Sequence, residues 1–204
     1  MIKLSVLIPV WNQEKLVIRA LDHIPRRNDV EVLVRDDGST DNTLKNLLDY
    51  SKTTDLNMAV FANAENKGLY ATMNLLLQDA HGEYFHQHNS DDYVDTQVYS
   101  ELIDLLDGMD VLAMDMRVND GSVWPVCEET NRIHCAQAVR FIRKSFVDGL
   151  KFNEEMKAAS DWYYNEEMLK RDPKIVYSGK VAYMYNYPRE GSLVDLRSRG
   201  IIGE

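Results

Sequence analysis

Cysteine is scarce in this 204-residue chain, which has two, Cys127 and Cys135. Two thiols cannot build the disulfide framework of a small secreted domain, so we expect both to be reduced in a cytoplasmic protein. Long apolar runs are also missing, because no stretch reaches the roughly 18 residues that a membrane-spanning helix needs. The short apolar run at the N-terminus, Leu4–Val10, lacks a small-residue cleavage site after it and predicts a strand rather than a signal peptide. A peripheral membrane contact stays open.

The chain has fewer basic than acidic residues. Lysine and arginine total 23 against 33 aspartates and glutamates, which gives a net charge of −10. A chain this acidic repels phosphate backbones, and nucleic acid is therefore disfavoured as a partner, whereas a divalent cation is not. One basic group, formed by Arg132, Arg140, Arg143 and Lys144, is either a local landing surface for DNA or the solvated face of a helix.

Glycine-rich phosphate-binding loops are absent. The sequence contains neither a P-loop with its lysine nor a G-x-G-x-x-G pattern, which argues against kinases, ATPases and dinucleotide dehydrogenases. The segment after the first apolar run, Trp11–Glu14, is acidic and has no glycine. This segment disfavours the nucleotidyltransferases, which usually carry a basic glycine-rich loop at that point.

What is present is an ordinary globular composition, with 45% hydrophobic and 27% charged residues. The first half alternates two patterns. We expect strands over Leu4–Val10, Val30–Val34, Met58–Ala62 and Glu83–His88, and helices over Lys15–Ile24, Thr43–Tyr50 and Leu69–Ala80. This alternation predicts an α/β fold with a mainly parallel central sheet that has helices on both faces.

The second half is less regular. We expect helices over Gln97–Leu106, Ala136–Arg143 and Asp161–Arg171, and strands over Val111–Met116, Lys174–Tyr177 and Val181–Tyr187. No repeat or low-complexity linker separates the halves. The sequence therefore predicts a single domain over residues 1–204.

Polar residues gather where three of the predicted strands end. They are Pro9–Asn12, Asp36–Ser39 and Asn89–Asp92. Ligands of open α/β sheets bind at the carboxyl ends of strands, so these segments would converge on one cleft. Each cluster taken alone favours a turn or a helix N-cap. Two pairs of aspartates at strand ends favour a site.

Several motifs resemble those of the family 2 glycosyltransferases. In chain order the matching segments are Ser5–Asn12 (SVLIPVWN), Val34–Thr43 (VRDDGSTDNT), Asn66–Gly68 (NKG), Ala71–Asn74 (ATMN), Ala80–Tyr84 (AHGEY), Asn89–Tyr93 (NSDDY), Ser160–Trp162 (SDW) and Tyr183–Ser192 (YMYNYPREGS). Each match is modest alone, but the order and spacing are those of the family. The resemblance covers nearly the whole chain.

The resemblance implies the GT-A fold and an inverting enzyme that moves a sugar from a nucleotide-diphosphate donor, UDP or dTDP by preference, to the hydroxyl of a glycan or another acceptor. Residues 1–95 would bind the nucleotide sugar, and residues 96–204 would bind the acceptor and carry the catalytic base. The sugar, the acceptor and the oligomeric state stay open.

The resemblance also assigns the nucleotide site. It would consist of Pro9, Trp11, Asp36, Asp37, Asn89, Ser90 and Asp91. The ring of Trp11 would stack on the base. Asp37 or Asp36 would accept a hydrogen bond from a base N–H, which suits uracil or thymine, while the other aspartate is a candidate for a structural turn.

The diphosphate needs a counter-charge, for which the resemblance implies Mn²⁺ or Mg²⁺. Asp91, with Asp92 beside it, would be the metal ligand in a D-x-D-like motif whose first acid is replaced by Asn89. His86 and His88 share one strand face, so metal ligation is conceivable, although histidines satisfied within the sheet are the simpler interpretation.

Asp161 matches the family's catalytic acid and would be the general base, with Ser160 in place of the neighbouring glutamate. A helix N-cap is the alternative role for Asp161. Lys67, Arg189 and Ser192 are candidates for phosphate or sugar contacts, and a solvated side chain is the alternative for the two cations. The two replaced acids also allow a second function, a degenerate transferase that binds nucleotide or glycan without turnover. A transferase acting on modified DNA bases is a third.

Overall fold

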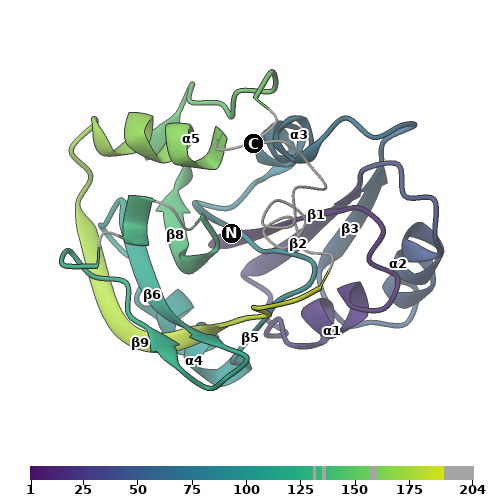
Figure 1. Ribbon diagram of the computed structural model, residues 1–204, viewed down its shortest axis with the longest axis horizontal. Helices are drawn as coiled ribbons and strands as arrows, with labels where there is room; N and C mark the ends of the chain where they lie inside the picture. Colours follow the sequence, from purple (N-terminus) through teal and green to yellow (C-terminus); the bar gives the residue numbers. More distant parts are fainter. Residues whose placement is uncertain (131, 135–136, 157–159, 191–204) are drawn as a thin grey trace.

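The computed structural model describes residues 1–130, 132–134, 137–156 and 160–190. Over these ranges the chain forms one mixed nine-stranded sheet in the order β3-β2-β1-β4-β8-β6-β9-β5, with β7 paired to β6 (Figure 1). The first half of the chain supplies β3, β2, β1 and β4 at one side of this sheet and β5 at its opposite edge, and the second half supplies the strands between them. The two halves meet where β4 pairs with β8 and where β5 pairs with β9.

The first-half strands are parallel. They are β1 (Leu4–Val10), β2 (Val30–Asp36), β3 (Met58–Ala62) and β4 (Tyr84–Gln87), with β1 between β2 and β4. All seven residues of β1 are buried, as expected for a strand covered on both faces. The predicted bounds of β1 and β3 are confirmed. The others are confirmed to within two residues.

The helices between these strands are α1 (Val17–Asp22), α2 (Thr43–Ser51) and α3 (Leu69–Asp79), and α4 (Thr96–Asp104) follows β5 (Tyr93–Val94). α3 packs on β1 and β2, and α4 packs on β9. Figure 1 shows α3 above the strands and α1 and α4 below them. Helices therefore cover both faces of the sheet, as the sequence predicts. Among the described residues, no helix has the length and apolar character needed to cross a membrane.

The second half adds β6 (Val111–Val118), β7 (Val123–Trp124), β8 (Arg140–Arg143), α5 (Ser160–Leu169) and β9 (Ile175–Tyr185). Short 3-10 turns cover Arg132–His134, Gln137–Val139 and Lys144–Val147. β8 runs antiparallel to both β4 and β6, whereas β9 is parallel to β6 and antiparallel to β5. The two strands predicted after Lys174 are one long strand, β9, with an irregular register against β6.

The helix predicted over Ala136–Arg143 is wrong. Its described part is one 3-10 turn followed by β8, which lies between β4 and β6. Phe141 and Ile142 are buried there, and pairing with strands distant in sequence outweighs the local helical spacing.

One of the two interpretations of the basic group, the solvated face of a helix, is wrong, because Arg140 and Arg143 lie on β8. Arg140 is fully buried and donates from Nη1 to the Ile133 carbonyl at 2.6 Å. Arg143 forms an ion pair with Asp110, and Lys144 donates to the Ala80 carbonyl. These three side chains are therefore engaged in contacts within the protein.

Candidate functional site

The polar segments predicted to converge do lie at one edge of the sheet. β2, β1 and β4 are adjacent and parallel, and their carboxyl ends lead into Asp36–Asp37, Trp11 and Asn89–Asp92. Pro9 lies inside β1, where it is buried opposite Arg35. The Trp11 side chain is 51% exposed although it directly follows a fully buried strand. An exposed indole at this position leaves a flat apolar surface open to a ligand.

Trp11 stands on a loop that is held by the segment after β2. Most of the polar residues of that segment bond to the backbone or side chains of the residues that follow Trp11. The contacts are Asn12 N to Ser39 Oγ at 2.9 Å, Thr40 N to Asn12 Oδ1 at 2.8 Å, Gln13 N to Thr43 Oγ1 at 2.8 Å, Glu14 N to Asp41 Oδ2 at 3.2 Å and Asn42 N to Glu14 Oε2 at 3.0 Å. Asn12 adopts a φ of 51° to make these bonds. Much of the D-D-G-S-T-D-N-T motif therefore positions the indole.

Asp37 is fully used by the protein. Its Oδ1 accepts from Asn63 Nδ2 at 2.8 Å and from the Lys67 backbone N at 2.9 Å, and its Oδ2 accepts from the Gly68 backbone N at 2.9 Å. The residue is 4% exposed. Asp37 thus fixes the loop that leads from β3 into α3. The Lys67 side chain itself is exposed.

Asp36, by contrast, keeps one carboxylate oxygen without a hydrogen-bond partner among the described residues. It is 1% exposed, and its Oδ2 accepts from Ser39 N at 3.0 Å. Its Oδ1 is buried and has no hydrogen-bond partner among the described residues. Buried acceptors are nearly always satisfied, so an unsatisfied carboxylate oxygen at a strand end is suited to a donor from a ligand. The structure thereby distinguishes two aspartates that the sequence leaves equivalent.

Asp91 and Asp92, the second pair of aspartates, also differ in burial and in hydrogen bonding. Asp92 is 1% exposed, and its Oδ2 accepts from Tyr183 OH at 2.5 Å and Asn89 Nδ2 at 2.9 Å. Its Oδ1 accepts from Asn186 N at 2.8 Å. Burial and the charge of Asp91 raise the pKa of Asp92 to about 6, against the effect of these hydrogen bonds. Asp92 therefore ties the acidic turn, in which Ser90 is also buried, to the end of β9.

Asp91 presents its carboxylate at the edge of the site. Its Oδ2 lies 2.7 Å from Arg189 Nη2, and the two side chains are 20% and 23% exposed. The Asp91 carbonyl accepts from Arg19 Nη2 at 2.8 Å, and the Arg19 guanidinium lies 5.0 Å from the centre of the Tyr93 ring. The turn is thus held from below by α1. The Asp91 carboxylate already forms an ion pair with the cationic side chain of Arg189.

The carboxylates at this edge suit a metal ion that takes most of its ligands from phosphates and water rather than from the protein. The described residues contain no group of three or more histidines, cysteines, aspartates or glutamates that could hold an ion. Mg²⁺ in nucleotide sites is typically held by one or two carboxylates and completed by phosphates and water. Asp91 fits that pattern, provided that the cation displaces Arg189. Asp92, with both oxygens hydrogen-bonded, fits as a support for the turn.

The two histidines of β4 and its end lie inside the sheet. His86 is fully buried, with Nδ1 2.6 Å from Tyr99 OH and Nε2 2.7 Å from the Ala138 carbonyl. His88 is fully buried too, and its Nδ1 lies 2.7 Å from the Asn89 carbonyl. Burial lowers their pKa values to about 3 and about 4. Both rings are neutral at pH 7, and His86 has no nitrogen left for a metal.

Asp161 lies in the first turn of α5 as described, over Ser160–Leu169. Its Oδ1 is 3.4 Å from Tyr70 OH on α3, and its carbonyl accepts from Gln137 Nε2 at 3.3 Å. Ser160 is fully buried, and its Oγ accepts from Asn153 N at 2.7 Å. Ser160 therefore supports the start of α5. Ser192 lies outside the described residues.

Sequence reasoning missed two contributors to the site, Arg19 and Tyr70. Arg19 is the one cation of α1, whose other residues apart from Asp22 are apolar, and a lone cation in such a helix is the available signal. Tyr70 gave no signal, because its proximity to Asp161 depends on the packing of α3 beside α5. An open depression of about 580 Å³ beside β5, lined by His23, Tyr93 and Arg117 among others, includes none of the predicted strand-end ligands.

Comparisons with known proteins identify a family and a fold for this chain. A model of glycosyl transferase family 2 matches residues 5–171. The poly(ribitol-phosphate) beta-N-acetylglucosaminyltransferase TarS of Staphylococcus aureus is 26% identical over 94% of this chain and 36% of its own length. A poly(ribitol-phosphate) beta-glucosyltransferase of Bacillus spizizenii is 32% identical over 47% of the chain. The chain spans about a third of the length of the first of these relatives.

Solved structures give the same fold. S. aureus TarS 1-349 in complex with UDP-GlcNAc superposes with a TM-score of 0.81 at 25% identity, over 94% of this chain and 60% of that chain. The mannosyltransferase PcManGT of Pyrobaculum calidifontis, in complex with GDP-Man and Mn²⁺, gives a TM-score of 0.75 at 18% identity, over 99% and 65%. The expected GT-A fold is confirmed.

Proposed function

The chain belongs to glycosyl transferase family 2, and from this premise we propose that it is an inverting, metal-assisted transferase of a sugar from UDP or dTDP to an acceptor hydroxyl. The observation that carries the donor assignment is the arrangement at three adjacent strand ends. An exposed indole, an unsatisfied buried carboxylate oxygen and a cation-binding carboxylate follow β1, β2 and β4. In this proposal residues 1–204 act as one domain. Residues 1–95 bind the donor, and residues 96–204 bind the acceptor and supply the base.

The base of the nucleotide would stack on Trp11 and donate its ring N–H to Asp36 Oδ1. Uracil and thymine carry an N–H between two carbonyl groups, whereas the corresponding nitrogen of cytosine is an acceptor. A carboxylate that accepts at this point therefore selects UDP or dTDP over a cytidine nucleotide. Asp37 would shape the site without touching the base. The UDP-GlcNAc complex of TarS supports a uridine donor.

The diphosphate would lie beside Asn89, Ser90 and Asp91. A divalent cation, Mn²⁺ or Mg²⁺, would be held by Asp91, and when bound it supplies positive charge to the diphosphate leaving group. Arg189, 2.7 Å from Asp91, has the planar fork that suits a phosphate. Lys67 remains a candidate for a phosphate or sugar contact through its exposed side chain.

Asp161 would act as the general base. Its carboxylate accepts the proton of the acceptor hydroxyl while that oxygen attacks the anomeric carbon from the face opposite the diphosphate. The new C–O bond forms as the bond to the diphosphate oxygen breaks, which inverts the anomeric configuration. The Tyr70 hydroxyl, 3.4 Å from Asp161 Oδ1, would hold the carboxylate in place.

Turnover tests this proposal. Release of UDP or dTDP from UDP-GlcNAc, UDP-glucose, UDP-galactose and dTDP-glucose is measured with Mn²⁺, with water or an added methyl glycoside as the acceptor of the sugar, for the native chain and for Asp161→Asn. We expect release from at least one donor and a loss of about 100-fold or more in the variant, the usual contribution of a general base. Nucleotide binding without any release would instead identify a degenerate binding module. An unchanged rate in Asp161→Asn would remove the assigned base.

A further inference from the structure

Three aromatic rings gather beside the acidic turn, and the donor site described above uses none of them. Trp124 of β7 lies 6.3 Å from Tyr185 and 5.6 Å from Tyr187, centre to centre. Tyr185 and Tyr187 stack at 5.4 Å with 10° between their planes. All three side chains are partly exposed. These residues, Trp124, Tyr185 and Tyr187, are called the aromatic cluster below.

The aromatic cluster is held firmly in place. The turn between β6 and β7 bonds to the residues that follow β9, with Asn119 N donating to the Tyr187 carbonyl at 3.1 Å. The Asn119 side chain donates to Asn186 Oδ1 at 3.1 Å and to the Pro188 carbonyl at 3.2 Å. The backbone that carries two of the rings is therefore fixed before any ligand arrives, which reduces the entropic cost of binding.

The same backbone is hydrogen-bonded to the acidic turn, Asn89–Asp92. Asn186, between the two tyrosines, donates its backbone N–H to Asp92 Oδ1 at 2.8 Å. Tyr183, two residues before Tyr185 on the same face of β9, donates to the other oxygen of Asp92. Burial, followed by the charges of Asp92 and Asp91, raises the pKa of Tyr185 to about 12. The aromatic cluster thus begins next to the turn that presents Asp91.

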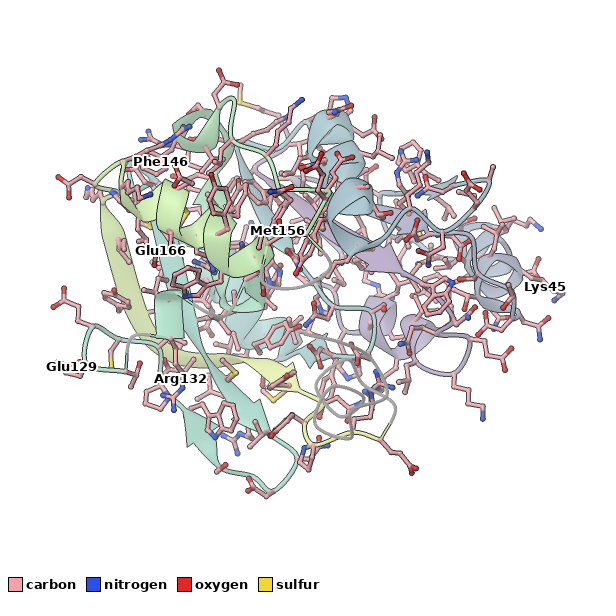
Figure 2. All side chains as sticks on the ribbon, turned by 45° about the horizontal axis from the view of Figure 1, so that its top comes forward. Lys45, Glu129, Arg132, Phe146, Met156 and Glu166 are labelled. Atoms are coloured by element: carbon pink, nitrogen blue, oxygen red, sulfur yellow. The ribbon has the colours of Figure 1, made fainter. Side chains whose placement is uncertain are left out.

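Trp124 and Tyr185 pack against the hydrophobic core on one side, and a cationic side chain lies at the rim of the cluster. The guanidinium of Arg132, labelled in Figure 2, lies 5.5 Å from the centre of the Trp124 ring, and Arg132 Nη1 donates to the Pro125 carbonyl at 2.8 Å. Aromatic faces with a few polar groups at their rim are typical of small-molecule sites. The negative face of an aromatic ring attracts the polarised C–H groups on one side of a pyranose, while hydroxyls at its edge bond to the rim.

We propose that the aromatic cluster is the acceptor subsite and stacks on the pyranose ring of a neutral saccharide acceptor. This rests on the proposed function, because an acceptor subsite presupposes a transferase. A saccharide is favoured over an anionic polyol phosphate, because an acyclic polyol has no ring face to stack on the cluster. In addition, the whole chain carries a charge of −10, and among the described residues Arg132 is the one cation over a ring of the cluster. The acceptor thus binds on second-half strands, beside the diphosphate region of the donor site.

The test uses saturation-transfer-difference NMR of the full chain in the presence of UDP. The probes are methyl β-D-glucopyranoside, methyl β-D-galactopyranoside, methyl N-acetyl-β-D-glucosaminide and ribitol 5-phosphate. The variants are Trp124→Ala and, in case that one fails to fold, Tyr187→Ala. The matched control is Phe61→Ala on the edge strand β3, since Phe61 also carries a guanidinium over its ring, that of Arg35 at 4.7 Å.

We expect saturation of the ring C–H protons of at least one methyl glycoside. Its affinity should fall about tenfold or more in Trp124→Ala and Tyr187→Ala, as for an aromatic residue at the centre of a contact, and should stay unchanged in Phe61→Ala. UDP affinity by calorimetry should stay native in all three. Binding of ribitol 5-phosphate alone, no glycoside binding, or native glycoside binding in both cluster variants would overturn the proposal. Failure of the native chain to bind UDP would instead contradict the proposed function.

Discussion

Replacing Asp36 and Asp37 separately should give opposite results. Asp37→Ala removes an acceptor from three donors, on Asn63, Lys67 and Gly68, in a region where Asp37 is 4% exposed. The Gly68 N–H keeps Asn66 Oδ1 and the Asn63 amide keeps Thr72 Oγ1 as acceptors, so at about 1 kcal/mol for each lost hydrogen bond the free energy of unfolding should fall by about 2 kcal/mol or more. Asp36→Ala loses one bond, to Ser39, and removes an unsatisfied oxygen, so its cost should be about 1 kcal/mol or less.

The binding of UDP should reverse this order. Asp36→Asn replaces a charged acceptor by an amide, and a hydrogen bond to a charged group contributes about 1.5–3 kcal/mol, so UDP affinity should fall about 10- to 100-fold. Asp37→Asn should bind UDP with near-native affinity under conditions in which it is folded, because its carboxylate faces the protein.

Urea denaturation followed by circular dichroism measures the first effect, and calorimetric titration with UDP measures the second. The reasoning is refuted if Asp36→Ala is as destabilising as Asp37→Ala. It also fails if Asp37→Asn, although folded, loses UDP binding while Asp36→Asn keeps it. That result would make Asp37 the residue that contacts the base.

Three further predictions follow from the same geometry. Trp11→Ala should weaken UDP binding in calorimetry by the about 1–3 kcal/mol that base stacking contributes, and an unchanged affinity would exclude stacking. Arg189→Gln should bind Mn²⁺ about two- to fivefold more tightly without nucleotide, measured by electron paramagnetic resonance, because Asp91 loses its competing cation. The rings of His86 and His88 should stay neutral in NMR titrations from pH 8 to about 5. Because the unfolded chain takes up those protons below about pH 6.5 and the folded chain does not, the two histidines have no pH-dependent effect on stability above that pH, and they reduce the free energy of unfolding as the pH falls from about 6.5 towards their folded-state pKa values. Titration of either ring near pH 6.5 would contradict this assignment.

The parallel half of the fold follows directly from the sequence. β1 and β3 have the predicted bounds, because continuous apolar runs bounded by polar turns specify buried strands with little help from distant residues. β8 was predicted as a helix, because its local spacing is helical and its place between β4 and β6 depends on partners far along the chain.

In the candidate site, too, some features follow from local sequence and others depend on residues far along the chain. Its location follows from the rule that parallel strands end at one edge, but the roles of neighbouring aspartates do not. Asp37 is bound by a loop 30 and 31 residues further on, and Asp91 meets Arg189 from the far end of the described chain. Such contacts leave no periodic signal in the sequence. They decide which carboxylate remains available to a ligand.

Calorimetric titration with UDP, dTDP, GDP and CMP, each with and without Mn²⁺, tests the central claim most directly, with Asp91→Ala as the comparison. The account predicts that UDP or dTDP binds, that Mn²⁺ strengthens this binding, and that Asp91→Ala abolishes the effect of Mn²⁺. Absence of binding by all four nucleotides, or binding of CMP or GDP as tight as that of UDP and dTDP, would contradict it.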